Sequence, residues 1–172
     1  EFRRVLFRSQ LFRIAELFAP EILAKSEKHR ARVQWELPVA HLAPLAERAS
    51  KRGIQFSCTP FYLDAVKELE PYVAFYKIAS YELLWGGLLE ACAKTGKPVI
   101  ISTGMATMPE IQTAVATLKR AQCRDITVLH CVSAYPAPPE EANLSAIEAI
   151  RNATGRSEEH TSELQSRETI SY

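Results

Sequence analysis

Short apolar segments alternate with helical segments along most of this 172-residue chain. The apolar segments begin near residues 54, 73, 98 and 126, and each is followed by a stretch with the apolar spacing of a helix. Strands this apolar are covered on both faces, and parallel strands joined by helical crossovers meet that requirement. The sequence therefore predicts an α/β fold built on a parallel sheet.

Local signals set the bounds of the predicted elements. We expect strands over residues 54–58, 73–78, 98–101 and 126–131, and helices over residues 39–52, 61–69, 83–94, 107–121 and 139–151. Gly53 and Gly96 each follow a helix at the position where glycine commonly ends one. Thr107 precedes another helix, with Glu110 three residues later, which is the spacing of a capping box. Residues 10–14 are interpreted as the tail of an earlier strand.

Two parallel architectures compete for this repeat. A doubly wound sheet requires a glycine-rich fingerprint after its first strand, and the sequence has none. A (β/α)8 barrel places polar residues after the carboxyl ends of its strands. Hydroxyl side chains follow the strands here: Thr59, Ser80, Ser102, Thr103, Ser133 and Tyr135. We therefore predict a partial TIM barrel of about four to five β/α units, because a full barrel takes ~250 residues.

Lys77 is the cation of the predicted site. It lies in an otherwise apolar strand, and a buried charge requires an anionic partner. That partner is either a protein carboxylate, in a structural ion pair, or the phosphate or carboxylate of a ligand. A cation beside a ring of neutral donors suits a small phosphorylated or carboxylated substrate. Glu82 is a candidate general acid or base at the same rim.

Composition limits the partners and the compartment. The net charge of +1 gives no electrostatic case for nucleic acid or an anionic membrane, and the apolar runs are too short to span a bilayer. Cys58, Cys92, Cys123 and Cys131 form no C-x-x-C pair and are interpreted as buried free thiols of a cytoplasmic protein. No histidine has metal-ligand spacing, so we predict no metal site within the chain, and His130 is interpreted as a structural residue.

The two ends of the chain are related to each other at the DNA level. Residues 1–9 read EFRRVLFRS and residues 156–164 read RSEEHTSEL. Codons for the second segment, read on the opposite DNA strand, encode all nine residues of the first, which unrelated protein segments would not do by chance. The pair resembles a translated sequencing-library adapter. We therefore expect residues 1–9 and 156–172 to be non-native, and residues 10–155 to be a partial barrel cut from a longer protein.

Four ordered motifs resemble the sialic acid synthase family, which includes the N-acetylneuraminate, legionaminate and pseudaminate synthases. They begin at Phe56 (FSCTPF), Tyr76 (YKIASYE), Thr95 (TGKPVIISTGMAT) and Leu129 (LHCVSAYPAPPE). The resemblance implies a (β/α)8 barrel that condenses phosphoenolpyruvate with an open-chain N-acyl-hexosamine aldehyde, such as N-acetylmannosamine. The implied products are phosphate and a nine-carbon 2-keto sugar acid.

The resemblance also implies roles for the rim residues. The positions that align with phosphoenolpyruvate-binding positions of the family are Thr59, Lys77, Ser80, Ser102, Ser133 and Tyr135. Ser133 stands where several members have asparagine. Glu82 matches the glutamate near the reacting carbons and is the implied catalytic residue. A divalent metal, Mn²⁺ or Mg²⁺, is implied as the Lewis acid that polarises the sugar aldehyde, and the parent protein is expected to be a homodimer.

Several family features have no counterpart in this sequence. They are the Ser-Asp-His-Thr-like segment with a metal-ligating histidine, the second metal histidine, the early phosphate-contacting lysine and the small C-terminal antifreeze-like domain. We therefore expect the metal ligands to lie outside this chain and the 172 residues alone to be inactive. Tyr81 stands where many N-acetylneuraminate synthases have glycine, which leans toward the pseudaminate-like branch and leaves the sugar acceptor open.

Two other functions remain open from the sequence. One is a non-catalytic α/β module that binds phosphate or phosphoenolpyruvate, or a half-barrel that oligomerises through open sheet edges. The other is a different barrel aldolase, in which Lys77 forms a Schiff base with a keto substrate. Phosphate release, oligomeric state and borohydride trapping of Lys77 distinguish these functions.

Overall fold

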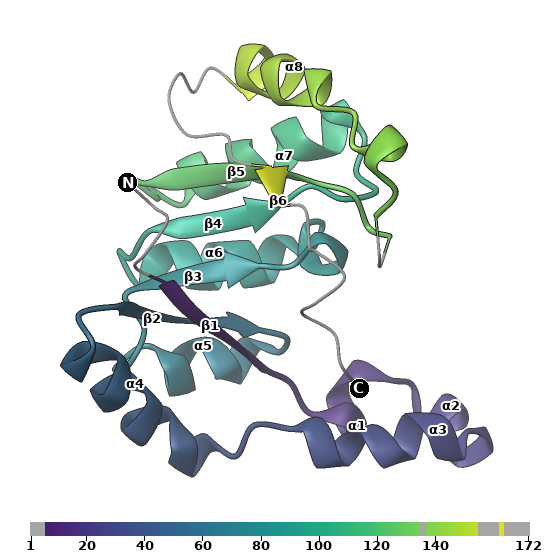
Figure 1. The fold of residues 1–172 in the computed structure, drawn as a ribbon, viewed down its shortest axis with the longest axis vertical. Coiled ribbons are helices and arrows are strands. Elements are labelled where there is room, and N and C mark those ends of the chain that lie inside the picture. The colour runs from purple at the N-terminus through teal and green to yellow at the C-terminus, as the bar shows by residue number, and fades with distance from the viewer. Residues whose placement is uncertain (1–5, 135–136, 155–161, 164–172) are drawn as a thin grey trace. The chain divides into compact units, whose positions relative to one another are not determined.

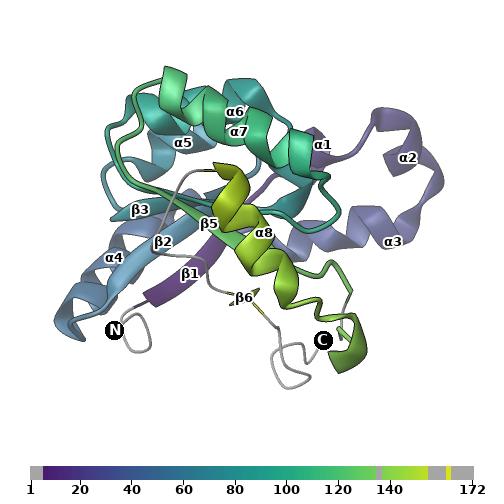
Figure 2. The ribbon, with the colours of Figure 1, turned by 90° about the horizontal axis from the view of Figure 1, so that it is seen from above.

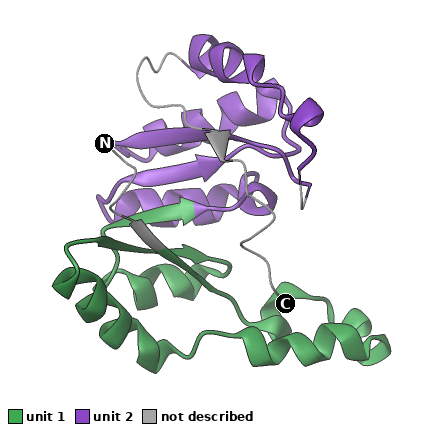
Figure 3. Ribbon diagram, in the orientation of Figure 1, with its two compact units in different colours: residues 1–77 green, residues 78–172 purple. Residues whose placement is uncertain are grey.

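The structure is a computed structural model that describes residues 6–134, 137–154 and 162–163. It divides into two compact units, with unit 1 ending at Lys77 and unit 2 beginning at Ile78 (Figure 3). Both units alternate parallel strands with helices along the chain (Figure 1), which confirms the predicted α/β class.

Unit 1 is built on three parallel strands in the order β1-β2-β3. The first strand, β1 (Leu6–Leu11), pairs with β2 (Gln55–Pro60) along its whole length. The third, β3 (Phe75–Ile78), pairs with β2 through Ser57 opposite Phe75 and Cys58 opposite Tyr76. Two of these strands overlap the segments predicted from apolar runs, and β1 includes part of the segment predicted to be non-native.

Two helices flank β2 along the chain, α4 (Leu42–Lys51) before it and α5 (Leu63–Leu69) after it. The fully buried hydroxyl of Tyr76 donates a 2.8 Å hydrogen bond to the Val66 carbonyl of α5. This bond joins the Tyr76 face of β3 to α5. The predicted end of α4 is confirmed, because Gly53 has a φ of 66°.

A helical excursion separates β1 from α4. It comprises α1 (Ile14–Leu17), α2 (Pro20–Lys25), α3 (Glu27–Arg30) and the 3-10 turns η2 (Ala31–Trp35) and η3 (Val39–His41). Figures 1 and 2 show α2 and α3 projecting away from the strands of unit 1. The strand tail predicted over residues 10–14 ends at Leu11. The Glu36 carboxylate accepts a 2.6 Å hydrogen bond from the amide of Ile14, the first residue of α1.

Unit 2 contains β4 (Val99–Ser102), β5 (Ile126–Cys131) and β6 (Ser162–Glu163), in parallel pairs and in that order. Its helices are α6 (Gly86–Lys94), α7 (Met108–Arg120) and α8 (Ser145–Thr154). The strand predicted over residues 126–131 is confirmed in full.

Side chains of α7 join it to α8. Gln112 donates a 3.3 Å hydrogen bond to the Ala153 carbonyl, and Lys119 donates one of 3.1 Å to the Thr154 carbonyl. At the start of α7, the Thr107 amide and hydroxyl both donate to one oxygen of Glu110, at 2.7 and 2.8 Å. The hydrogen bond from the Thr107 amide lowers the pKa of Glu110 below its ordinary value. The predicted capping box is confirmed.

Three predicted helices begin at least three residues later than expected, and one of them is the helix expected from residue 39, which begins at Leu42 after η3. The helix expected from residue 83 begins at Gly86, and a separate 3-10 turn, η4 (Ser80–Glu82), follows β3. The helix expected from residue 139 begins at Ser145, after another turn, η5 (Pro139–Glu141). Within the described ranges, no helix combines the length and apolar character needed to cross a membrane.

The glycine that ends α6 provides a stability test. Gly96 has a φ of 75°, where an alanine side chain is strained, so Gly96→Ala should lower the free energy of unfolding by about 1 kcal/mol. Gly86, the first residue of the same helix, has open space around a built Cβ and no positive φ. The control Gly86→Ala should therefore cause no loss in urea unfolding, and equal losses for the two variants would contradict the assigned role of Gly96.

Candidate active site

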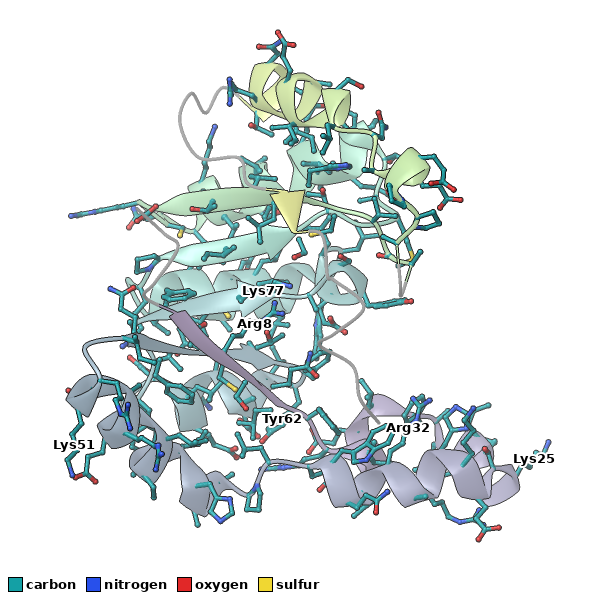
Figure 4. The ribbon with its side chains drawn as sticks, in the orientation of Figure 1. Arg8, Lys25, Arg32, Lys51, Tyr62 and Lys77 are labelled. Carbon is teal, nitrogen blue, oxygen red and sulfur yellow. The ribbon has the colours of Figure 1, made fainter. Side chains whose placement is uncertain are left out.

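Unit 1 contributes Thr59 and Lys77 on neighbouring strands. Cys58 lies opposite Tyr76 in the register, so the next residue of each strand, Thr59 and Lys77, faces the side of the sheet away from α5. Both are buried, with 1% and 8% of their surfaces exposed. Figure 4 labels Lys77 on β3. The predicted cation therefore lies beside a predicted hydroxyl on one face of unit 1.

The same face of unit 1 continues onto β1. Gln10 lies opposite Thr59 in the register, and Arg8 lies opposite Ser57. Because side chains alternate along a strand, Arg8 and Gln10 share the face that carries Thr59 and Lys77. Figure 4 labels Arg8 on β1. A polar row, Gln10–Thr59–Lys77, thus crosses the carboxyl-terminal halves of the three strands.

In unit 2, η4 and the segments that follow β4 and β5 lie close together at Gly104. The buried Gly104 amide donates a 3.1 Å hydrogen bond to the Ser80 hydroxyl oxygen. A Cβ at this position would overlap the Ser133 Oγ and lie 2.9 Å from the Ser80 Oγ. The absence of a side chain therefore allows two predicted hydroxyls, from η4 and from the segment after β5, to lie close to Gly104.

The end of β4 contains two hydroxyls with different surroundings. The Thr103 hydroxyl donates a 2.9 Å hydrogen bond to the Leu129 carbonyl, so it joins β4 to β5. Ser102 is 1% exposed, and its Oγ has no hydrogen-bond partner among the residues that the structure describes. A buried hydroxyl without a partner is costly. Of the two hydroxyls at this strand end, that of Ser102 is therefore the one available to hydrogen-bond a ligand.

The other predicted residues are placed as follows. Glu82 is half-buried in η4, and its amide donates a 3.1 Å hydrogen bond to the Ala79 carbonyl. Tyr135 lies outside the described residues. The His130 ring nitrogen Nε2 lies 2.8 Å from the Ala142 carbonyl oxygen, which confirms its interpretation as a hydrogen-bonded structural residue.

Burial disfavours the thiolate form of two of the four cysteines. Cys58, Cys92 and Cys123 are buried, as predicted, whereas Cys131 is half-buried. Burial raises the pKa of the Cys58 and Cys92 thiols to about 12, so both are protonated at neutral pH.

A charged cluster after β1 and β2 was not predicted. Arg13 donates hydrogen bonds to Glu16 at 3.0 Å and to Glu68 at 2.6 Å, and its guanidinium carbon lies 4.3 Å from the centre of the Tyr62 ring. The Tyr62 hydroxyl donates a 2.6 Å hydrogen bond to Glu68, and burial together with this bond raises the Tyr62 pKa above its ordinary value. The cluster joins the segment after β1 to α5, across 55 residues of sequence between Arg13 and Glu68.

The described residues contain no group of three or more His, Cys, Asp or Glu side chains that is placed to hold a metal ion. They do not by themselves fit the divalent metal that the resemblance implies. Gly104 is the site residue that the sequence analysis did not assign, and its available signal was a glycine directly after the strand-end residues Ser102 and Thr103.

Parallel strands and helices in alternation, with a buried lysine and hydroxyls at the strand ends, are features of a segment of a β/α barrel. The chain belongs to the NeuB family, whose match covers residues 10–162.

Individual relatives agree with this assignment. An uncharacterized protein of Methanocaldococcus jannaschii is 44% identical over 134 residues, which cover 76% of this chain and 39% of that protein. The pseudaminic acid synthase of Helicobacter pylori is 43% identical over 108 residues, which cover 62% of this chain and 32% of that protein.

A solved structure supports the fold directly. The crystal structure of N-acetylneuraminic acid (sialic acid) synthetase from Leptospira borgpetersenii superposes with a TM-score of 0.76 at 34% identity, covering 84% of this chain and 50% of that chain. The predicted partial-barrel fold is thereby confirmed. The chain spans from 32% to 50% of the lengths of these three proteins.

The packing around Gly104 predicts a coupled pair of substitutions. Gly104→Ala should lower the free energy of unfolding by about 1–3 kcal/mol, because the new methyl group overlaps Ser133. In a Ser133→Ala background the loss should shrink by about 1 kcal/mol in urea unfolding. Ser145, an exposed serine of unit 2, provides the control, and Gly104→Ala with Ser145→Ala should be additive. Additivity with Ser133→Ala as well would contradict the contact.

Proposed function

We propose that the parent protein of this chain condenses phosphoenolpyruvate with an N-acyl-hexosamine aldehyde, such as N-acetylmannosamine. The products are a nine-carbon 2-keto sugar acid and phosphate. Membership of the NeuB family over residues 10–162 carries the proposal, and the convergence of Ser80 and Ser133 at Gly104 supports it. The similar proteins from H. pylori and L. borgpetersenii are named as pseudaminic acid and sialic acid synthases, respectively.

The proposed reaction forms one carbon–carbon bond. The enol carbon of phosphoenolpyruvate attacks the aldehyde carbon, which leaves a cation at the pyruvyl C2. Water adds to this carbon, and departure of phosphate with a proton lost from the adduct leaves the keto group. A site for this chemistry must hold two anionic groups, the phosphate and the carboxylate, while the carbon atoms approach each other.

The chain's own residues supply the binding of phosphoenolpyruvate in this proposal. Lys77 provides the positive charge, and charge-assisted hydrogen bonds to phosphate or carboxylate are the stronger kind. The hydroxyl donors are Thr59, Ser80, Ser102, Ser133 and Tyr135. Glu82, two residues from Ser80, is assigned proton transfer at the reacting carbons as a general acid or base.

The remainder of the site belongs to other parts of the parent protein. When bound, a divalent metal, Mn²⁺ or Mg²⁺, would polarise the aldehyde. We place its ligands outside this chain, since the described residues do not fit them. We further propose that residues 10–155 are the native segment; the family match begins at Gln10 and continues to residue 162, beyond the proposed end. The parent is proposed to be a cytoplasmic homodimer.

Phosphate release tests the division between chain and parent. With phosphoenolpyruvate, N-acetylmannosamine and Mn²⁺, this chain alone should release no phosphate above the uncatalysed rate, whereas the parent should turn over. In the parent, Lys77→Gln should lower kcat/KM for phosphoenolpyruvate by about 10- to 100-fold, the value of a charged hydrogen bond. Lys67, which pairs at the surface with Asp64 at 3.5 Å, provides the control Lys67→Gln, with no change expected.

Three outcomes would contradict this proposal in different ways. Turnover by the isolated chain would show that it contains a complete site. A parent that binds phosphoenolpyruvate but releases no phosphate with N-acyl-hexosamines would support the non-catalytic binding module. Trapping of a keto substrate on Lys77 by borohydride would support the Schiff-base aldolase.

Ser102 allows binding and stability to be separated. Its hydroxyl has no partner among the described residues, so Ser102→Ala should leave the free energy of unfolding equal or higher while weakening phosphoenolpyruvate binding to the parent about ten-fold. Ser57, another buried serine, donates a 3.1 Å hydrogen bond to the Phe75 carbonyl. The control Ser57→Ala should therefore cost about 1 kcal/mol of stability. Unchanged affinity in Ser102→Ala, measured by calorimetry, would remove Ser102 from the site.

A further inference from the structure

Two large apolar side chains lie exposed directly beside the hydroxyl cluster of unit 2. Tyr81 follows Ser80, and Met105 follows Gly104. They are 74% and 62% exposed, the two highest values among the large apolar residues of the described chain. The Gly104 amide donates a hydrogen bond to the Ser80 hydroxyl, so Tyr81 and Met105 each come directly after one of two hydrogen-bonded residues.

The backbone of Met105 is unusual. Its φ is 68°, in the left-handed region that glycine, asparagine and aspartate occupy most readily and that other residues avoid. A methionine here gains no compensating burial within the described residues, since its side chain is exposed. Backbone strain of this kind concentrates at ligand-binding positions. The choice of methionine over glycine therefore points to a use for its side chain.

The place of these residues relative to the proposed substrates indicates that use. The acceptor must bring its aldehyde carbon to phosphoenolpyruvate, so the rest of the sugar lies at the rim next to the hydroxyls. The acceptor's distinctive apolar part is the methyl group of its N-acyl substituent. Methionine adapts its shape to apolar groups, and a tyrosine ring offers a flat apolar face with a polar edge.

We propose that Tyr81 and Met105 form an apolar platform that binds the methyl group of the acceptor's N-acyl substituent and so determines acceptor specificity. This inference rests on the proposed function and adds to it the part of the acceptor that is recognised. Tyr81 and Met105 act on the choice of sugar, whereas the hydroxyls of Ser80, Ser102 and Ser133 act on phosphoenolpyruvate.

The length of the acyl group is the variable that tests the platform. In the full-length parent, kcat/KM should rise by about ten-fold from N-formylmannosamine to N-acetylmannosamine, the effect of one buried methyl group. In Tyr81→Ser and in Met105→Gly this ratio should fall to within about two-fold, with the KM for phosphoenolpyruvate unchanged. Met105→Gly should also raise the melting temperature, because glycine relieves the strained φ.

Leu84 provides the matched control, because it lies three residues after Tyr81 and is 61% exposed. Leu84→Ser should keep the acyl ratio of the unaltered parent. An unchanged ratio in Tyr81→Ser and Met105→Gly would overturn the platform. A rise in the KM for phosphoenolpyruvate by the same factor as the fall in kcat/KM for the acceptor would also overturn the platform. The two side chains would then affect both substrates, and they would not determine acceptor specificity.

Binding of the acceptor gives a readout of the platform that does not depend on synthase activity. A parent without synthase activity would contradict the proposed function but would leave this binding test in place. Met105 and Met108 are the two methionines of this chain, so methyl labelling of the 172-residue chain gives one reporter at the platform and one control in α7. Saturating N-acetylmannosamine with phosphoenolpyruvate present should shift the Met105 methyl resonance and leave that of Met108 in place. Absence of this shift, or its persistence in Tyr81→Ser, would overturn the inference.

Discussion

The turn after β4 depends on the absence of a side chain at Gly104. A Cβ there would occupy the space of the Ser133 hydroxyl, so only glycine allows its amide to reach Ser80. Glycine is costly because it restricts the unfolded chain least. At this position the cost is offset by close approach of three segments. The positions of the Ser80 and Ser133 hydroxyls in unit 2 therefore depend on the space left by the missing Cβ of Gly104.

Unit 1 positions its polar residues by a different device. Thr59 and Lys77 are neighbours because the register of β2 and β3 sets which residues share a face. The Arg13–Tyr62–Glu68 cluster then fixes the segment that leaves β1 against α5, so that the helical excursion starts from a rigid point. Backbone register and a compact ionic cluster together define the polar face of this unit.

Local signals explain what the sequence was able to predict. Apolar runs located the strand Ile126–Cys131, and the Thr107–Glu110 pair and Gly96 located helix ends, since each signal acts within a few residues. The later start of α6 was missed because Leu83, Leu84 and Trp85 extend its apolar run toward the N-terminus. The Gly104 contact was missed because it joins positions 24 residues apart in sequence, as Ser80 and Gly104 are. The site residues were predicted from their positions at strand ends and from a family resemblance. These two signals indicate which residues belong to the site, but they do not predict which of them contact each other.

The strand β1 has a consequence beyond this chain. It pairs with β2 through six consecutive positions, although we propose that residues 1–9 have no common history with the rest of the protein. Pairing of parallel strands uses peptide groups that every non-proline residue carries. The outer position of such a sheet is therefore open to foreign sequence of suitable length. Residues added ahead of a β/α segment can therefore pair as a strand without any resemblance to the strand that they join.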